Sequence, residues 1–143
     1  MKSLGSLLLL AILSLGLGSG GHAAAARAGD EGKTSGTVTR VYPSGGKYEG
    51  EIRDGQRNGQ GTYWYASGDI YEGQWKDGKK HGWGIYRWPD GNRYEGEWVN
   101  GQRHGSGVFI FADGGIFDGE WRFNEPVEQP SGRKPPPRRM ANE

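Results

Sequence analysis

Alternating apolar and polar residues along the middle of the chain predict short β-strands. Between residues 71 and 93, the runs 71–75 (YEGQW) and 84–88 (GIYRW) both alternate, and Asp77-Gly78 lies between them. Alternation with a period of two is typical of a half-buried strand, and Asp-Gly between two such runs is a strong hairpin signal. The pattern therefore predicts one β-hairpin in this stretch.

The hairpin pattern recurs with a period of 23 residues. Full copies begin at Tyr48, Tyr71 and Tyr94, and half copies flank them on both sides. Self-similarity at a fixed period indicates a repeat array, in which each unit is stable only when it packs against its neighbours. We therefore expect an antiparallel meander that fills residues 36–126.

An odd repeat length constrains the turns. Since side chains alternate faces with a period of two, equivalent positions return to one face only where an odd loop or a bulge intervenes. Proline suits the first corner of a type I turn that is followed by a left-handed glycine. Three-residue loops are therefore expected at 43–45 (PSG), 89–91 (PDG) and 112–114 (ADG). With these loops, one face carries rings and glycines, and the other is mixed.

Glycine recurs at three positions of every unit. We expect structural roles for these glycines, because a strand position without a Cβ leaves a trough in which a neighbouring ring can lie flat. The set consists of Gly50, Gly73 and Gly96, of Gly59, Gly82 and Gly105, and of Gly61, Gly84 and Gly107.

The repeat resembles the MORN family, whose unit reads roughly YEGEW-x-NG-x-x-HG-x-G-x-Y-x-x-x-DG. The resemblance covers about two thirds of the chain. It implies an all-β fold, an elongated single-layer antiparallel meander of tandem β-hairpins. It also implies a binding function, since MORN-repeat proteins are associated with membrane attachment, phosphoinositide binding, dimerisation and grooves that hold a partner peptide.

The two ends of the chain differ from the array. Residues 1–28 resemble a secretory signal peptide, with Lys2 before an apolar run and small residues that place the cleavage near Ala26 or Ala28. We therefore expect an exported protein, periplasmic or secreted, and an uncleaved anchor is the alternative. Residues 29–35 are expected to be a linker, and residues 127–143 a disordered, proline-rich basic tail.

The charge balance argues against a nucleic-acid partner. Removing residues 1–28 takes away Lys2 and Arg27 and no acid, so that 16 basic and 17 acidic residues remain. A nucleic-acid or anionic-lipid surface would need an excess of positive charge. The chain has no cysteine, so disulfides cannot stabilise it.

All Tyr, Trp and Phe residues lie between Tyr42 and Phe123, inside the expected array. Exposed aromatic patches usually mark interaction surfaces, so we expect a binding or scaffold module for a protein partner or for a second copy of the chain. The alternatives are a glycan, a cell-envelope component or a phospholipid membrane on the same face, or rings that only hold the sheet together. The candidate partner-binding residues are Tyr63, Tyr65, Tyr71, Trp75, Tyr86, Trp88, Tyr94 and Trp98.

No pattern in the chain indicates an enzyme. His81 and His104 occupy the repeat position of Asn58, beside a turn glycine, where polar residues suited to turns are expected. We expect no catalytic residue, no cofactor, no metal and no small-molecule substrate. Lys76, Lys79 and Lys80 surround a turn and are expected to be solvated.

Overall fold

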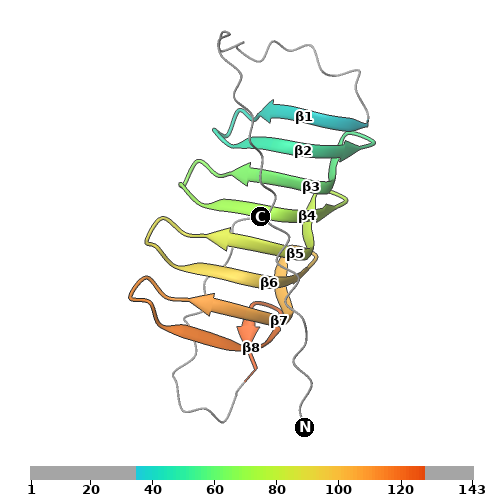
Figure 1. Ribbon diagram of the computed structural model, residues 1–143. Coiled ribbons are helices and arrows are strands. Elements are labelled where there is room, and N and C mark those ends of the chain that lie inside the picture. The colour runs from blue at the N-terminus through green and yellow to red at the C-terminus, as the bar shows by residue number, and fades with distance from the viewer. Residues whose placement is uncertain (1–34, 128–143) are drawn as a thin grey trace, which may run out of the picture.

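The computed structural model describes residues 35–127, which form one antiparallel sheet of nine strands and no helix. The strands follow one another in sequence order (Figure 1). They are β1 (Gly36–Val41), β2 (Lys47–Arg53), β3 (Gln56–Trp64), β4 (Ile70–Lys76), β5 (Lys79–Arg87), β6 (Arg93–Val99), β7 (Gln102–Ile110), β8 (Ile116–Arg122) and β9 (Glu125–Pro126). The predicted all-β meander of tandem hairpins is confirmed. The predicted signal peptide, and nearly all of the predicted linker and tail, lie outside the described residues.

Three-residue loops connect the hairpins at one side of the sheet. In the loop 89–91, the N–H of Gly91 donates to the carbonyl of Trp88 (3.1 Å), and the N–H of Trp88 donates to the carbonyl of Asn92 (3.0 Å). Gly91 has a φ of +87°, the left-handed conformation expected there. The same hydrogen bonds close loops 43–45, 66–68 and 112–114. The three predicted loops are confirmed, and the loop 66–68 is a fourth.

Two-residue turns close the hairpins at the opposite side of the sheet. Both residues of each turn have positive φ, as in a type I′ turn; the values are +49° at Asp77 and +79° at Gly78. We call these turns and the residue on each side of them the hairpin tips. Successive hairpins are joined at their tips, because the N–H of Gly78 donates to the carbonyl of Arg57, the residue after the preceding tip (2.9 Å).

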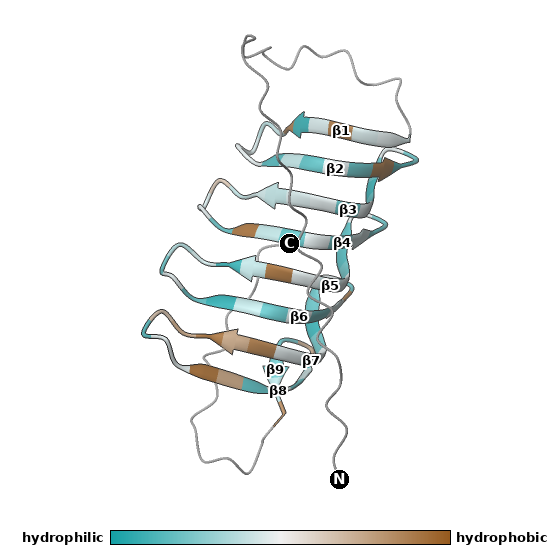
Figure 2. Ribbon diagram, in the orientation of Figure 1, coloured by the Kyte–Doolittle hydropathy of each residue, from teal (hydrophilic) through white to brown (hydrophobic). Residues whose placement is uncertain are grey.

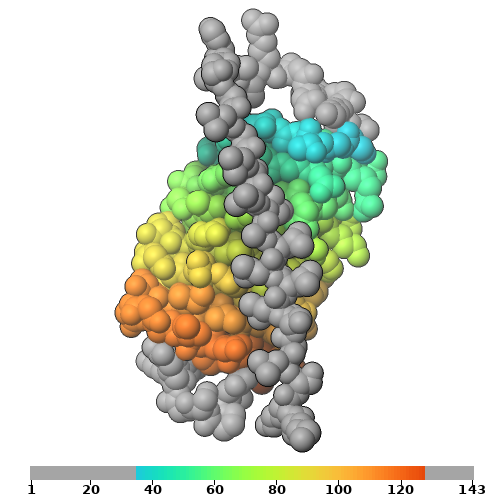
Figure 3. All heavy atoms as spheres, viewed as in Figure 1, coloured from blue at the N-terminus to red at the C-terminus, as the bar shows by residue number. Residues whose placement is uncertain are grey.

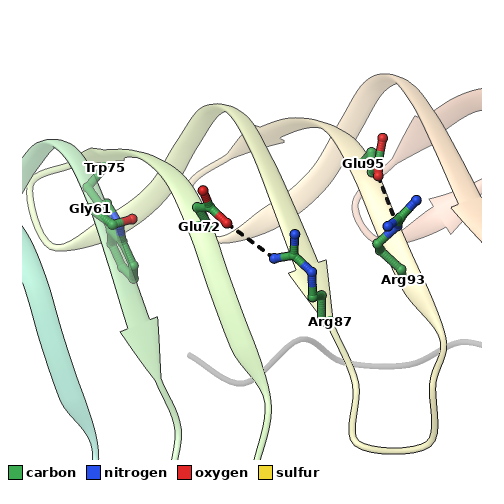
Figure 4. A network of polar contacts seen from close by, with 6 residues as sticks. All are labelled: Gly61, Glu72, Trp75, Arg87, Arg93 and Glu95. Atoms are coloured by element: carbon green, nitrogen blue, oxygen red, sulfur yellow. Dashed lines mark hydrogen bonds and ion pairs between the residues drawn. The ribbon is translucent and has the colours of Figure 1, made fainter. Parts of the chain in front are cut away.

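Each hairpin bends between its paired glycines and its tip. Gly73 pairs with Gly84, but the next pair is Trp75 with Lys80, so β5 has two extra residues at the bend. Gly82 lies among them with a φ of +57°, which favours glycine. Figure 4 shows the ribbon arching over at this level in successive hairpins. The sheet is therefore a trough whose hairpin tips fold over one of its two faces.

The two faces of the sheet differ as the alternation predicts. We call the face under the hairpin tips the inner face, and the opposite one the outer face. In the middle repeat, the buried aromatic residues of the inner face are Tyr71, Trp75, Tyr86 and Trp88. The outer face carries Glu72, Gln74 and Trp83, which are exposed, with Ile85 and Arg87 half-buried.

The core of this sheet is aromatic and is not marked by high hydropathy. Figure 2 shows β7 and β8 as the most apolar strands, whereas β2 and β6 are mainly hydrophilic or neutral. Even so, Tyr48 in β2 and Tyr94 and Trp98 in β6 have no exposed surface. Tyrosine and tryptophan combine a large apolar ring with a polar group, so a hydropathy index scores them near the middle although they bury much area.

Two rows of rings run along the inner face and join the repeats. In the first row, Trp98 packs edge-on against Tyr71 (5.3 Å between ring centroids) and against Tyr94 (5.3 Å). In the second row, Tyr86 packs against Tyr65 (5.9 Å) and Trp88 (4.7 Å). Every ring in these contacts touches a ring from a neighbouring strand or repeat, so the core is continuous from repeat to repeat. The space-filling view shows the coloured repeats following one another without a break (Figure 3).

Candidate binding site on the inner face

The ring that begins each repeat is held in a trough made by two glycines. A Cβ at Gly84 would lie 2.6 Å from Cε2 and Cζ of Tyr71, so no other residue fits beneath that ring. At Gly73 a Cβ would lie 2.5 Å from the Cα of Gly84. Equivalent contacts surround Tyr48, at Gly50 and Gly61, and Tyr94, at Gly96 and Gly107.

The third set of glycines forms the bends instead of the ring troughs. Gly59, Gly82 and Gly105 have φ values of +72°, +57° and +58°. The residue that the pairing skips on the neighbouring strand, Glu51, Gln74 or Glu97, places its side chain over each of them. In the last repeat this residue is Glu97, whose Oε1 accepts a hydrogen bond from the N–H of Ser106 (3.2 Å). The recurring Glu or Gln therefore satisfies a backbone donor that the bend leaves outside the ladder.

Hydrogen bonds fix the orientation of the rings. The hydroxyl of Tyr71 donates to the carbonyl of Gln74 (2.9 Å). The indole N–H of Trp98 donates to the carbonyl of Gly84 (3.2 Å), and that of Trp75 donates to the carbonyl of Gly61 (3.0 Å; Figure 4). Each tryptophan therefore ties its own repeat to the one before it.

The structure changes the expectation of an exposed aromatic surface. Seven of the eight candidate rings are buried, and only Tyr65 is half-buried; the buried ones are Tyr63, Tyr71, Trp75, Tyr86, Trp88, Tyr94 and Trp98. The physical reason is the bend, which the sequence pattern did not reveal and which brings the hairpin tips over the rings. Most of these residues form the core. A ligand on the inner face has access only to the surface that lies between the tips.

The residue that follows each of the first three tips places a cation on the inner face. Arg57, Lys80 and Arg103 lie one repeat apart, over Trp75 (4.4 Å from its centroid), Trp98 (5.3 Å) and Trp121 (4.5 Å) respectively. Lys80 is 2% exposed, so the expectation that it is solvated is wrong. Two features of the sequence pointed to this position. Counting alternate residues back from Tyr86 places Lys80 on the inner face, and a basic residue recurs at the position of Lys80 in all three repeats.

A pocket of about 220 Å³ lies on the inner face at the middle repeat. Its lining consists of Arg57, Tyr65, Trp75, Gly78, Lys79, Lys80, Asn100 and Gly101. It contains two of the predicted site residues, Tyr65 and Trp75, and two successive hairpin tips. The other predicted rings do not line it.

The pocket lies where a lysine replaces an arginine. Arg57 donates to the carbonyl of Gly78 in the next tip (2.8 Å), and Arg103 donates to the carbonyl of Asn124 in the next tip (2.9 Å). The Nζ of the equivalent Lys80 donates to the hydroxyl of Tyr65 (3.4 Å). Gly101, which occupies the repeat position of Gly78 and Asn124, lines the pocket.

Burial shifts the ionisation of groups on the inner face. It raises the pKa of Tyr65, whose ring lines the pocket. It also lowers the pKa of Arg103 to about 10, which leaves the guanidinium charged at neutral pH. The pocket lining contains three cations and no acidic side chain, so the pocket is positively charged.

The outer face has a different character. Arg87 pairs with Glu72 (3.3 Å) and Arg93 pairs with Glu95 (2.9 Å), both on the side of the ribbon away from the tips (Figure 4). Exposed ion pairs of this kind contribute little to stability. Trp83 is 52% exposed on this face.

The part of the chain that the structure describes shows neither a metal site nor a membrane-spanning helix. Residues 35–127 contain no group of three or more His, Cys, Asp or Glu side chains placed to hold a metal ion. They also contain no helix with the length and apolar character that a membrane span requires.

Comparison with known families agrees with this architecture. The family model described as the MORN repeat matches residues 48–70, 71–93 and 94–116, which are the three whole units of the array. This chain is a MORN-repeat protein. No curated protein matches it. MORN repeats are typically modules that bind proteins or membranes, so this MORN array belongs to a class of binding modules.

Proposed function

We propose that this protein is a non-enzymatic, exported binding module that holds a segment of a protein partner on its inner face, at the pocket of the middle repeat. The observation that carries the proposal is the composition of that pocket. The rings of Tyr65 and Trp75 form apolar walls, and Arg57 and Lys79 bring charged side chains to the same lining. Pockets with apolar walls and a few fixed polar groups are typical ligand sites.

The rigidity of the array supports a binding role. Ring contacts and indole hydrogen bonds link every repeat to the next, and the tips are joined by backbone hydrogen bonds. A site built on such a scaffold loses little conformational entropy when a partner binds. A polypeptide segment suits the site because it supplies side chains for the pocket and backbone groups for the tips.

Export forms part of the proposal and rests on the sequence of residues 1–28. The segment has a basic start, an apolar run too short for a membrane span, and small residues at the expected cleavage site. Cell fractionation of the full chain, followed by mass determination of the mature N-terminus, tests this. Recovery of an uncleaved chain from the cytoplasm would refute it.

The binding proposal can be tested by selecting peptides on the full chain from a displayed random-peptide library. Peptides that are enriched should lose affinity with Tyr65→Ala, which removes a pocket wall, and should keep it with Trp83→Ala on the outer face. Circular dichroism confirms that both variants fold. If no peptide is enriched, or if only Trp83→Ala weakens binding, the inner-face function is refuted.

A second copy of the chain is the other form of protein partner. Light scattering after size exclusion distinguishes it, since a dimer that dissociates with Tyr65→Ala assigns the inner face to self-association. A dimer that persists in this variant would place the contact elsewhere on the array.

Glycan or envelope binding is a second candidate function, and the exposed Trp83 favours it. A sugar ring stacks on a flat aromatic surface, and the burial of seven inner-face rings leaves that face with no comparable platform. Sedimentation with insoluble cell wall, compared between the wild type and Trp83→Ala, tests this role. Cosedimentation that is insensitive to Trp83→Ala would exclude the outer-face platform.

A further inference from the structure

A row of exposed polar residues with one aromatic ring crosses the outer face at the level where the hairpins bend. From β3 to β8 the row consists of Gln60, Gln74, Trp83, Glu97, Ser106 and Glu120, and all six residues are exposed. Trp83 lies directly opposite Glu97 in the register of β5 and β6. Because the tips fold over the inner face, this row lies on the convex side of the arch that each hairpin makes (Figure 4). We call it the outer crest.

The fold does not require the ring of Trp83. The N–H of this residue donates to Oε1 of Gln74 (3.1 Å), and the N–H of Gln60 and of Ser106 donates to a glutamate at the equivalent position. The backbone, and not the side chain, therefore meets the structural requirement at this position. In the part of the chain that the structure describes, the indole N–H of Trp83 makes no hydrogen bond, whereas that of Trp98 donates to a glycine carbonyl. Both the ring and its donor are available to a ligand.

Building on the second candidate function, glycan or envelope binding, we infer that the outer crest binds an uncharged sugar chain with one sugar ring stacked on Trp83. This residue is 52% exposed, and its ring offers a large apolar surface with a polar group at the edge. The strands on either side lie ~4.8 Å away and place Gln74 and Glu97 beside the ring. A sugar ring has the matching form, because its face is apolar and its hydroxyls lie around the edge.

The groups beside the ring suit hydroxyls. The amide of Gln74 keeps two N–H donors, since only its oxygen is used by the N–H of Trp83. The carboxylate of Glu97 accepts the N–H of Ser106 with Oε1, which leaves Oε2 as an acceptor. A hydroxyl both donates and accepts, so one sugar ring can bond to the amide on one side and to the carboxylate on the other.

The charge of the outer crest selects against acidic sugars. The crest carries the carboxylates of Glu97 and Glu120 and no basic side chain. Arg87 and Arg93 on the same face are each paired with a glutamate. A carboxylated or sulfated sugar would therefore be repelled. A cationic ligand would be attracted, but salt would weaken its binding because exposed charges are screened.

The test applies the labelled full chain to an array of defined oligosaccharides, uncharged, carboxylated and sulfated, with a Lys/Arg-rich peptide beside them. Uncharged oligosaccharides should be retained, and equally at low and high salt. Trp83→Gln should weaken their binding about tenfold or more in isothermal titration calorimetry, through loss of the stacked ring. This variant should fold, since the first repeat has glutamine at the same position, Gln60.

The matched control removes another tryptophan from the outer face. Trp64 lies outside the outer crest, and Trp64→Ile introduces the residue that the third repeat has at the same position, Ile110. This variant should bind the retained oligosaccharides as the wild type does. An equal loss in Trp64→Ile and Trp83→Gln would refute the assignment to the outer crest.

The contrary results separate this inference from the functions proposed above. If no uncharged oligosaccharide is retained, or if Trp83→Gln binds as the wild type does, the inference is wrong. Should the full chain then still sediment with insoluble cell wall in a Trp83-dependent manner, the envelope-binding function stands without the sugar. Retention of the basic peptide alone, weakened by salt and by Glu97→Gln, assigns the outer crest to a cation instead. Peptide binding on the inner face is tested separately, by Tyr65→Ala.

Discussion

The glycine trough under Tyr71 makes a prediction about stability. In Gly84→Ala the new Cβ would lie 2.6 Å from Cε2 and Cζ of Tyr71 and closer still to its hydroxyl, so the ring must move. Moving it breaks the hydrogen bond to the carbonyl of Gln74 (2.9 Å), which contributes about 1 kcal/mol. It also disturbs the edge-on contacts with Trp75 (5.0 Å) and Trp98 (5.3 Å), each worth about 0.5–1.5 kcal/mol.

We therefore expect Gly84→Ala to lower the free energy of unfolding by about 2 kcal/mol. This value allows for about 0.5–1 kcal/mol of stabilisation from the less flexible unfolded chain. Equilibrium urea unfolding of the full chain, followed by tryptophan fluorescence, measures the effect. The control is Gly114→Ala, where a Cβ meets nothing within 4 Å and the left-handed φ of +85° costs about 1–2 kcal/mol.

This comparison shows whether position 84 requires glycine because of the Tyr71 ring or because of its backbone conformation. If Gly84→Ala destabilises the protein no more than Gly114→Ala does, the trough does not constrain the ring and the reasoning is refuted. A double-mutant cycle adds a second check. In the background of Tyr71→Ala, Gly84→Ala should cost less than about 1 kcal/mol, because the ring that it displaces is absent.

Three further predictions follow from other parts of the repeat. Trp98→Phe should lower the unfolding free energy in urea by about 1–3 kcal/mol, because the buried carbonyl of Gly84 loses its indole donor; an unchanged midpoint would contradict this. Glu97→Gln should change the free energy of unfolding by less than about 0.5 kcal/mol, because the middle repeat uses a glutamine to accept the same hydrogen bond. Glu97→Ala should lower it by about 1 kcal/mol, because the N–H of Ser106 loses its acceptor. Equal losses in the two variants would refute the capping role. An unfolded tyrosine loses its proton near pH 10, and burial raises the pKa of Tyr48 to about 12. The contribution of Tyr48 to stability should therefore be constant below pH 10 and fall as the pH rises from 10 to 12. Urea midpoints across that range should fall less steeply in Tyr48→Phe, and identical slopes would refute the assignment.

The sequence by itself determined the architecture of the repeat. The period of 23 residues, the glycine-bearing turns and the alternation were enough to predict a meander of hairpins with loops of odd length. These features are local, because turn type depends on a few neighbouring residues, and the side on which a side chain lies depends only on strand parity. For the same reason the ring face of the middle repeat was predicted correctly.

Only the tertiary structure showed that the ring face is a core. The bend at Gly82 depends on two extra residues in β5 and on a side-chain cap from β4, and neither has a distinctive local pattern. Once the bend is present, the tips cover the rings, and the cations at positions 57, 80 and 103 lie among them. The pocket lies between one tip and the next, whose residues are a full repeat apart in the sequence. The physical reason is that burial depends on which segments meet in space, whereas the alternation of residues along a strand only separates its two sides.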